Sequence, residues 1–387
     1  MNVRQYTSAT DRRKALEKET NVPLTNIGTF SLDESAASTR NCENMIGVAQ
    51  VPMGVAGPLR VIDLHSRTRD TYVPLATTEG ALVASVNRGC KAIMESGGAV
   101  TNSHSAGASR GPVFRVNNLS ESKKLYEFLD THFTDLKKVT ESTSHHLTLK
   151  KITSRGVGRY RYARFVYDTG DAMGLNMVTL ATDAAAAYIK KETGIACVAL
   201  SGNFCTDKKP SWQNFVENRG HKAWAEVTVP GRVLKNTLKT TAKSAYETWL
   251  AKCMIGSAMS GSMGFNAQYA NVLSAIFIAT GQDPAHVSEC AVGVTTAEVV
   301  NGEDLYVSVY LPDLMVGTVG GGTGLATQKE ALDILGVAGG HDGKNASALA
   351  EIIAAAVLAG ELSLLSSLEE GSLAASHKRL ARGGSTT

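Results

Sequence analysis

The chain has 387 residues, of which 43% are apolar and 19% are charged. This length and balance are typical of a globular protein with two or three domains, and they exclude a largely disordered chain. The net charge of +3 is too small to favour nucleic acid or an anionic membrane as the main partner.

Cysteine and histidine usage favours neither disulfides nor a metal centre. The six cysteines form no C-x-x-C pair, and the nine histidines lack zinc-binding spacing, so we expect reduced thiols and no metal. The first residues are polar, unlike a signal peptide, and the longest apolar run, 352–360, is half of the roughly 20 residues that a membrane helix needs. These features predict a cytoplasmic protein that contacts no membrane.

The first predicted elements are helices. Residues 11–20 predict a short charged helix capped by Thr10 or Asp11. Apolar residues at helical spacing over 78–95 predict a second helix with Glu79 in its first turn. Because the neighbours of Glu79 are small and mostly apolar, we expect its carboxyl to be partly desolvated.

A small α+β unit is predicted next. Strand-like runs at 112–116 and 159–167 flank a helix over 121–137, and a long helix follows with Asp171 at its start. Helices over 256–280 and 346–367 are rich in small residues, which allow close packing. Together the elements predict a mixed α+β or α/β fold, with an N-terminal helical segment (1–30), a large helix-rich domain (31–111 and 200–370), a smaller inserted domain (112–199) and a C-terminal segment (371–387).

Four polar residues allow either a chemical or a structural interpretation. Lys208, in SGNFCTDKKP, is either a solvated loop lysine or a cation near a developing oxyanion. Glu79 either complements a helix dipole or acts as a general acid. Asp283, in GQDPAH, is either a turn residue or a site carboxylate, and His377, in SHKRLAR, is either a surface histidine or a proton donor.

Two glycine clusters favour close approach of the backbone to a ligand. They are GDAMG (170–174) and GTVGGGTGLATQ (317–328). Neither follows the G-x-G-x-x-G pattern of a Rossmann dinucleotide site, and the sequence contains no Walker A motif. The clusters therefore support neither of those two nucleotide-binding folds, and taken singly they leave the kind of ligand open.

In their order along the chain, these segments resemble the catalytic portion of 3-hydroxy-3-methylglutaryl-CoA (HMG-CoA) reductases, most of all the class I branch. The resemblance runs from about residue 40 to residue 382. The matching strings are ENMIGVAQVPMGVAGPL, TTEGALVASVNRG, GDAMGLNM, SGNFCTDKKP, GSAMSGSMGFNAQYAN, GQD, GTVGGGT, ELSLL and SHKRLAR.

The resemblance implies reduction of HMG-CoA to mevalonate and CoA by two NAD(P)H, through bound mevaldyl-CoA and mevaldehyde. Lys208 would hold the oxyanion, and Glu79 would supply the proton in the aldehyde step. Asp283 would lie between them in a shared hydrogen-bond network, and His377 would protonate the departing CoA thiolate. The substrate-binding residues would be Arg110, Ser201, Lys209, Lys252 and Asn271.

By the same resemblance, the smaller domain (112–199) would be a ferredoxin-like, non-Rossmann unit that binds the dinucleotide. The expected assembly is a homodimer with its active site at the interface and ENMIG as an interfacial segment, with a tetramer as the alternative. The segment 371–387 would be a flexible lid. The cofactor-binding residues would be Ser144, His145, Asp171, Met173, Gly174, Asn176, Gly320, Gly321 and Gly322.

One departure from the family bears on the cofactor. His145 stands where many class I members have an arginine that pairs with the 2′-phosphate of NADPH. No carboxylate adjoins His145 in the sequence, and His146, Lys150 and Lys151 are near, so NADPH is favoured and NADH is the alternative. The sequence also lacks the membrane anchor of the animal and fungal enzymes, which points to a bacterial or archaeal source.

Two other functions compete with the reductase. A CoA-thioester hydrolase or lyase would not need GDAMG and GTVGGGT together with the lysine. A catalytically silent CoA-binding or scaffold protein would have lost at least one of four residues that are all present, namely Glu79, Lys208, Asp283 and His377.

Overall fold

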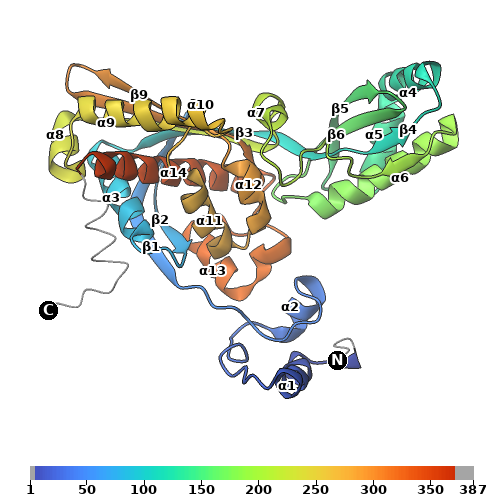
Figure 1. Cartoon of the computed structure of the whole chain (residues 1–387), viewed down its shortest axis with the longest axis horizontal. Coiled ribbons are helices and arrows are strands. Elements are labelled where there is room, and N and C mark those ends of the chain that lie inside the picture. The colour runs from blue at the N-terminus through green and yellow to red at the C-terminus, as the bar shows by residue number, and fades with distance from the viewer. Residues whose placement is uncertain (1–4, 371–387) are drawn as a thin grey trace.

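The computed structural model describes residues 5–370, and its elements confirm a mixed α/β fold (Figure 1). The strands are β1 (Met53–Asp63), β2 (Thr68–Ala76), β3 (Ala99–Arg110), β4 (Val113–Arg115), β5 (Thr148–Val157), β6 (Tyr160–Asp168), β7 (Cys197–Ala199), β8 (Gly220–Val229), β9 (Val294–Val300) and β10 (Asp304–Leu314). The helical elements are α1 (Ala9–Thr20), α2 (Glu34–Arg40), α3 (Leu82–Glu95), α4 (Leu119–Thr131), α5 (Phe133–Glu141), α6 (Leu175–Thr193), α7 (Trp212–Glu217), α8 (Gly231–Val233), η2 (Leu234–Leu238), α9 (Ala242–Trp249), η3 (Leu250–Gly256), α10 (Ser257–Ser260), α11 (Tyr269–Thr280), η4 (Pro284–His286), α12 (Val287–Cys290), η5 (Gly321–Gly324), α13 (Ala326–Ile334) and α14 (Lys344–Glu370).

The long strand β3 belongs to two sheet regions. Its residues 100–107 pair with β8, and its start pairs with β1, within a large sheet that also contains β2, β9 and β10. Its end, Ala108–Arg110, pairs instead with β6. The strand therefore connects the large body, at the left of Figure 1, with the smaller unit at the right.

The smaller unit has the element order β4, α4, α5, β5, β6, α6 and β7. Its strands lie in the order β7-β4-β6-β5, with every ladder antiparallel. This is the β-α-β-β-α-β arrangement of ferredoxin-like units.

Helix α14 is the centre of the large body. It packs against α3, α9, α11 and the strands β3 and β8. The helix is long and apolar enough to cross a membrane over residues 344–368, but 83% of its most apolar window is buried inside the protein. Small residues allow this packing: a Cβ at Gly89 of α3 would lie 1.9 Å from the carbonyl oxygen of Ala359.

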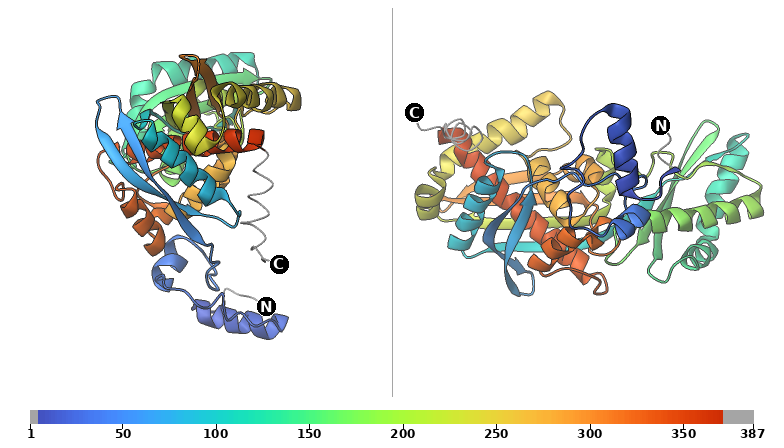
Figure 2. Two further views of the ribbon diagram at one scale, coloured as in Figure 1. Left: turned by 90° about the vertical axis from the view of Figure 1, so that its left-hand side faces the viewer. Right: turned by 90° about the horizontal axis from the view of Figure 1, so that it is seen from below.

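The N-terminal segment lies apart from the large body, with α1 and α2 below it (Figures 1 and 2). A small apolar cluster of Ala9, Ala37 and Met45 holds it together, and Leu325 of the large body packs against this cluster. The predicted cap of α1 was wrong. Ser8 caps the helix, because its side chain accepts a hydrogen bond from the Asp11 amide at 3.0 Å.

Three other predicted boundaries were also wrong. The helix expected over 121–137 is two helices, α4 and α5, which meet at His132. The long helix α6 begins at Leu175, because Gly174 has a φ of +80° that a helix cannot continue. The helix expected over 256–280 is interrupted by a loop after Gly261, which has a φ of +68°.

Candidate active site

A cavity of about 830 Å³ lies where the large body meets the N-terminus of α6. The loop before α7, the turn after α11 and the glycine segment around η5 form its other walls. Nine residues expected in a site line it: Arg110, Met173, Gly174, Asn176, Lys208, Asp283, Gly320, Gly321 and Gly322.

An ion pair between Lys208 and Asp283 lies in this cavity. Lys208 Nζ is 2.6 Å from Asp283 Oδ2, and the side chains are 38% and 34% exposed. The other carboxylate oxygen of Asp283 accepts from the Ala285 amide at 3.0 Å, so Asp283 also caps the 3-10 turn η4. Burial raises the pKa of Asp283, but the hydrogen bonds from Lys208 and Ala285 outweigh it and hold the pKa below its ordinary value.

A buried ionic network lies behind this pair. Arg219 and Glu289 are fully buried, and Arg219 Nη1 is 2.7 Å from Glu289 Oε1. Arg219 also pairs with Asp207 at 2.9 Å, and Arg110 lies 3.5 Å from the same aspartate. Burial raises the pKa of Glu289, but hydrogen bonds and charges from His286 and Arg219 hold it below its ordinary value.

His286, Glu289 and Arg219 were not among the site residues expected from the sequence. The signal for the first two was their spacing, since they follow Asp283 at intervals of three residues. Asp207, His286 and Glu289 have ligand atoms within 4.8 Å of one another, as in a metal site. Here the Arg219 guanidinium supplies positive charge to both carboxylates.

Glu79 and Asn271 form a second polar pair, away from this cavity. Asn271 Nδ2 donates to both carboxylate oxygens of Glu79, at 3.0 and 2.9 Å. The predicted place of Glu79 in a first helical turn was wrong, because α3 begins only at Leu82. Its expected desolvation was also wrong for the single chain, in which the side chain is exposed.

The single chain therefore does not bring Glu79 beside Lys208 and Asp283. Asn271 stands near the start of α11, and Asp283 follows its other end. Residues 271–280 of that helix alone span about 14 Å at the α-helical rise. His377, the fourth residue expected to take part in the chemistry, lies outside the described residues.

The other residues expected at the substrate are dispersed. Arg110 lines the cavity and donates to Thr179 Oγ1 at 2.6 Å, while its Nε is buried without a hydrogen-bond partner. Lys209 Nζ donates to the carbonyl of Asp207 at 3.0 Å, and Ser201 Oγ lies 3.3 Å from the Cys205 sulfur. Lys252 lines a separate hollow of about 650 Å³ beside α10.

The predicted position of Asp171 at the N-terminus of α6 was wrong. Its carboxylate lies at the start of α14, where it accepts from the amides of His341 (2.5 Å), Gly343 (2.8 Å) and Ala346 (2.9 Å). Burial raises the pKa of Asp171, but these hydrogen bonds hold it below its ordinary value. Asp171 is thus a buried cap for another helix, beside the cavity but not among its lining residues.

Comparison with known proteins decides the family. The family model described as hydroxymethylglutaryl-coenzyme A reductase matches residues 8–382. The chain belongs to this family. It is 51% identical over 373 residues to the 3-hydroxy-3-methylglutaryl-coenzyme A reductase of Methanothermobacter thermautotrophicus, covering 96% of this chain and 93% of that one.

Other HMG-CoA reductases show the same relationship. That of Haloferax volcanii is 50% identical over 97% of this chain and 93% of its own length. That of Blattella germanica is 44% identical over 97% of this chain and 44% of its own length. The class II enzyme of Streptococcus pneumoniae, solved with NADPH in open conformations, has a TM-score of 0.68 at 18% identity and covers 94% of this chain and 97% of that one. At that identity the likeness shows the fold alone.

In this HMG-CoA reductase family member, Ser144 and His145 do not line the cavity. Ser144 follows α5 and contacts a residue of the cavity wall: its Oγ is 3.1 Å from the sulfur of Met177, and Met177 lines the cavity. His145 is exposed. The two lysines expected to add positive charge there are paired, Lys150 with Asp168 at 3.2 Å and Lys151 with Glu217 at 3.1 Å.

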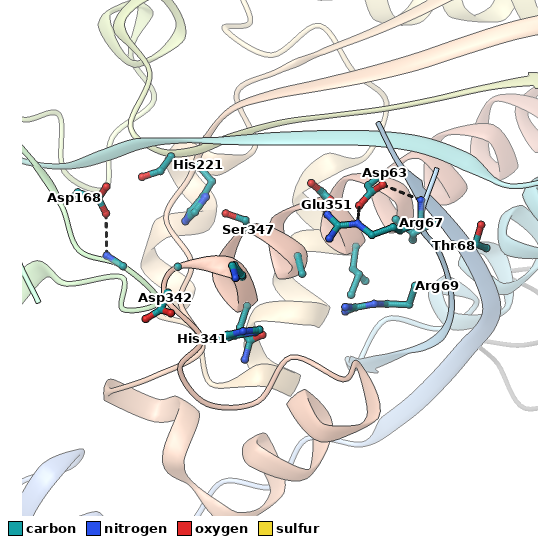
Figure 3. Close-up of a pocket in the computed structure, with 18 residues that line it drawn as sticks. Asp63, Arg67, Thr68, Arg69, Asp168, His221, His341, Asp342, Ser347 and Glu351 are labelled. Carbon is teal, nitrogen blue, oxygen red and sulfur yellow. Dashed lines mark hydrogen bonds and ion pairs between the residues drawn. The ribbon is translucent and has the colours of Figure 1, made fainter. Parts of the chain in front are cut away.

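A second cavity, of about 570 Å³, lies between the β1–β2 hairpin and the start of α14 (Figure 3). None of the expected site residues lines it. Asp63 pairs with Arg67 at 2.6 Å, and burial lowers the pKa of His221 to about 4, so that histidine is neutral at pH 7. Because nine of the expected site residues line the first cavity and none lines this one, the first cavity is the candidate site.

Proposed function

We propose that this chain reduces HMG-CoA to mevalonate and free CoA with two NAD(P)H, through bound mevaldyl-CoA and mevaldehyde. The observation that carries the proposal is the Lys208–Asp283 pair, held at 2.6 Å in a cavity lined by the glycine segment and the start of α6. A cation beside a carboxylate in such a cavity suits a reaction in which a carbonyl oxygen becomes an oxyanion.

The cavity fits a dinucleotide. Gly320 and Gly321 line it with φ values of +78° and +55°, and a Cβ on either would meet no protein atom within 4 Å. Side chains there would fill space that is open to a ligand. Met173, Gly174 and Asn176 also line the cavity, and with Ser144, His145 and Asp171 they complete the proposed cofactor-binding set. A bound nicotinamide supplies hydride, and the protein supplies orientation and proton donors.

Each residue of the site has a distinct role in this proposal. Lys208 stabilises the oxyanion of the thioester carbonyl and later that of the aldehyde. Asp283 holds the lysine ammonium in place, and Glu79 donates the proton in the aldehyde step. His377 protonates the CoA thiolate. The hydroxymethylglutaryl carboxylate is bound by polar groups from Arg110, Ser201, Lys209, Lys252 and Asn271.

The proposed assembly is a homodimer, with a tetramer as the alternative. Because α11 separates Asn271 from Asp283, Glu79 of one protomer completes the site around Lys208 of its partner. The exposed apolar side chains of Ile255 (52%) and Met259 (85%) lie beside the hollow that contains Lys252, and they favour burial against another protein surface.

Finer assignments belong to the same proposal. The subtype is class I, supported by the matching strings, and the location is the cytoplasm. The large domain (31–111 and 200–370) binds HMG-CoA, the smaller domain (112–199) binds the dinucleotide, and residues 371–387 form the lid. NADPH is favoured over NADH, and no metal takes part.

The test mixes purified protein with HMG-CoA and follows the oxidation of NADPH and NADH in parallel, with CoA release measured in the same samples. Two reduced cofactors consumed per CoA support the double reduction, and the faster cofactor gives the preference. CoA release without cofactor oxidation would instead identify a hydrolase or lyase. If no CoA is released and no cofactor is oxidised, the result would favour a catalytically silent CoA-binding protein.

A further inference from the structure

The segment that follows α11 aligns three ionisable side chains. Asp283, His286 and Glu289 lie along η4 and the short helix α12, each three residues after the last. His286 and Glu289 are fully buried, whereas Asp283 reaches the cavity. Such a row connects the cavity surface to the buried network behind it.

The His286 ring lies between two carboxylates. Its Nδ1 is hydrogen-bonded to Glu289 Oε1. Because a carboxylate can only accept, this nitrogen carries the hydrogen. The other nitrogen, Nε2, is buried without a hydrogen-bond partner and lies 3.8 Å from Asp283 Oδ2, the oxygen that contacts Lys208. A buried polar atom without a partner is uncommon, and this one is close to the carboxylate of the proposed site.

Glu289 also holds the other member of the ion pair. Its Oε1 accepts from the backbone amide of Lys208 at 3.2 Å. Lys208 has a φ of +57°, in the left-handed region that side-chain-bearing residues rarely adopt. The hydrogen bond therefore stabilises the turn from which the lysine side chain enters the cavity.

Glu289 is itself fixed from several directions. Arg219 donates to both of its oxygens at 2.7 Å, and Asn214 Nδ2 donates to Oε2 at 3.0 Å. Asp313, fully buried on β10, also faces Glu289, and burial with the Glu289 charge raises the pKa of Asp313 well above its ordinary value. Asp207 faces His286 from the loop before α7. Glu289 is thus held in one position and can fix the positions of Lys208 and His286, which it contacts.

We propose that Glu289 and His286 form a positioning pair, in which Glu289 anchors the Lys208 backbone and the His286 ring, and His286 orients the Asp283 carboxylate toward Lys208 Nζ. The inference rests on the proposed reductase function, in which Lys208 and Asp283 contact the reacting carbonyl. Neither member of the positioning pair touches substrate. Their effect is exerted through the geometry of the ion pair.

Two substitutions at His286 separate positioning from simple packing. The amide nitrogen of the longer glutamine side chain can take the place of Nε2, which faces Asp283 Oδ2, whereas that of the shorter asparagine side chain can replace only Nδ1, which faces Glu289. We expect kcat to fall about tenfold to a hundredfold in His286→Asn and clearly less in His286→Gln, with the KM for HMG-CoA nearly unchanged in both. Equal losses in the two variants, or a larger loss in His286→Gln, would overturn the proposal.

His221→Gln is the matched control, because His221 is also a buried histidine with an unpartnered ring nitrogen, Nδ1, and it lines the second cavity. It is expected to retain wild-type kcat. Thermal unfolding of all variants checks folding, and Glu289→Gln provides a second route: it keeps the side-chain shape and is expected to lower kcat through Lys208. Wild-type kcat in Glu289→Gln would contradict the proposal.

A readout without turnover keeps this inference separate from the proposed function. Lys208 in the intact protein is acetylated with acetic anhydride, and the modified lysines are quantified by mass spectrometry. Loosening of Asp283 in His286→Asn is expected to increase Lys208 acetylation several-fold relative to the wild type and His221→Gln. Unchanged acetylation would refute the positioning role, while an inactive wild type with the expected acetylation pattern would refute only the reductase function.

Discussion

At the scale of single residues, Lys208 is held from two sides. Its backbone amide is bonded to Glu289, and its ammonium group to Asp283. The left-handed conformation at φ +57° costs a non-glycine residue about 1–2 kcal/mol, so the turn depends on such contacts. A lysine without these contacts would sample many rotamers and seldom point into the cavity.

Replacement of that lysine tests its chemical role. We expect Lys208→Met to lower kcat by about 10²–10³-fold, because the oxyanion loses its charged partner. Steady-state NADPH oxidation with HMG-CoA measures the effect. Lys243→Met, at an 83% exposed lysine on α9, is the control and should behave like the wild type. A Lys208→Met enzyme with normal kcat would remove this lysine from the mechanism.

The hydrogen bonds of Asp171 predict how the stability of the protein depends on pH. Its pKa in the folded protein lies below the ordinary value, so its contribution to stability is complete above the unfolded-state pKa and is lost as the pH falls through the folded-state pKa. We expect Asp171→Asn to reduce the free energy of unfolding by about 1–3 kcal/mol at pH 7, and by progressively less below about pH 4.

Urea unfolding at several pH values measures this difference. Asp342→Asn is the control, because Asp342 lies close by but is exposed. Its φ of +50° suits asparagine as well as aspartate, so its stability should change little. A loss of stability in Asp171→Asn that is independent of pH would contradict the capping role.

At the scale of elements, close packing of α3 against α14 depends on glycine. A Cβ at Gly89 would be 1.9 Å from the Ala359 carbonyl oxygen, so Gly89→Ala requires the two helices to separate. We expect a loss of about 1–3 kcal/mol in the free energy of unfolding. Gly324→Ala is the control, since a Cβ there meets nothing within 4 Å. Chemical denaturation measures the free energy of unfolding of both variants. Equal values for Gly89→Ala and Gly324→Ala would show that α3 and α14 accommodate the added methyl group at little cost.

Sequence patterns predicted α1, α3, α6, α11 and α14 but placed their ends less well, and they did not predict α2, α7, α9, α12 or α13. The spacing of apolar residues over 346–367 predicted α14, because a buried helix of 27 residues has many apolar residues at helical spacing. Asp171 was assigned to the wrong helix, because an aspartate before a helical pattern is usually its cap, and only tertiary contact reveals a cap for a helix 170 residues later. Positive φ values at Gly174, just before α6, and at Gly261, just after α10, set helix boundaries that the periodicity of apolar residues does not reveal.

The site was predicted in a similar, partial way. The strings around Lys208 and Asp283 led to the cavity, since their positions in the chain matched a known family. Arg219 was missed because a buried ionic residue carries no local pattern that marks its partners, and the three-residue spacing of His286 and Glu289 after Asp283 was overlooked. Asp207 and Glu289, for instance, are brought together by Arg219, which lies outside the quoted motifs.

At the scale of the whole molecule, the proposed interfacial site can be tested by subunit mixing. Glu79→Gln and Lys208→Met are each expected to be inactive. Mixed after dissociation and reassociation, half of the dimers are hybrids, and each hybrid has one site with both residues intact, so about a quarter of wild-type activity should return. NADPH oxidation measures the recovery, and mixing each variant with itself is the control. No recovery from proven hybrids would place Glu79 and Lys208 in one protomer.

The position of α14 in the chain has a consequence for synthesis. Among the described elements it is the last to leave the ribosome, yet it is the helix around which the large body packs. Until residues 344–370 have emerged, the surfaces of α3, α11, β3 and β8 that pack against α14 lack this partner. The nascent chain therefore exposes these surfaces through most of its translation, when a chaperone that shields apolar segments is of greatest use.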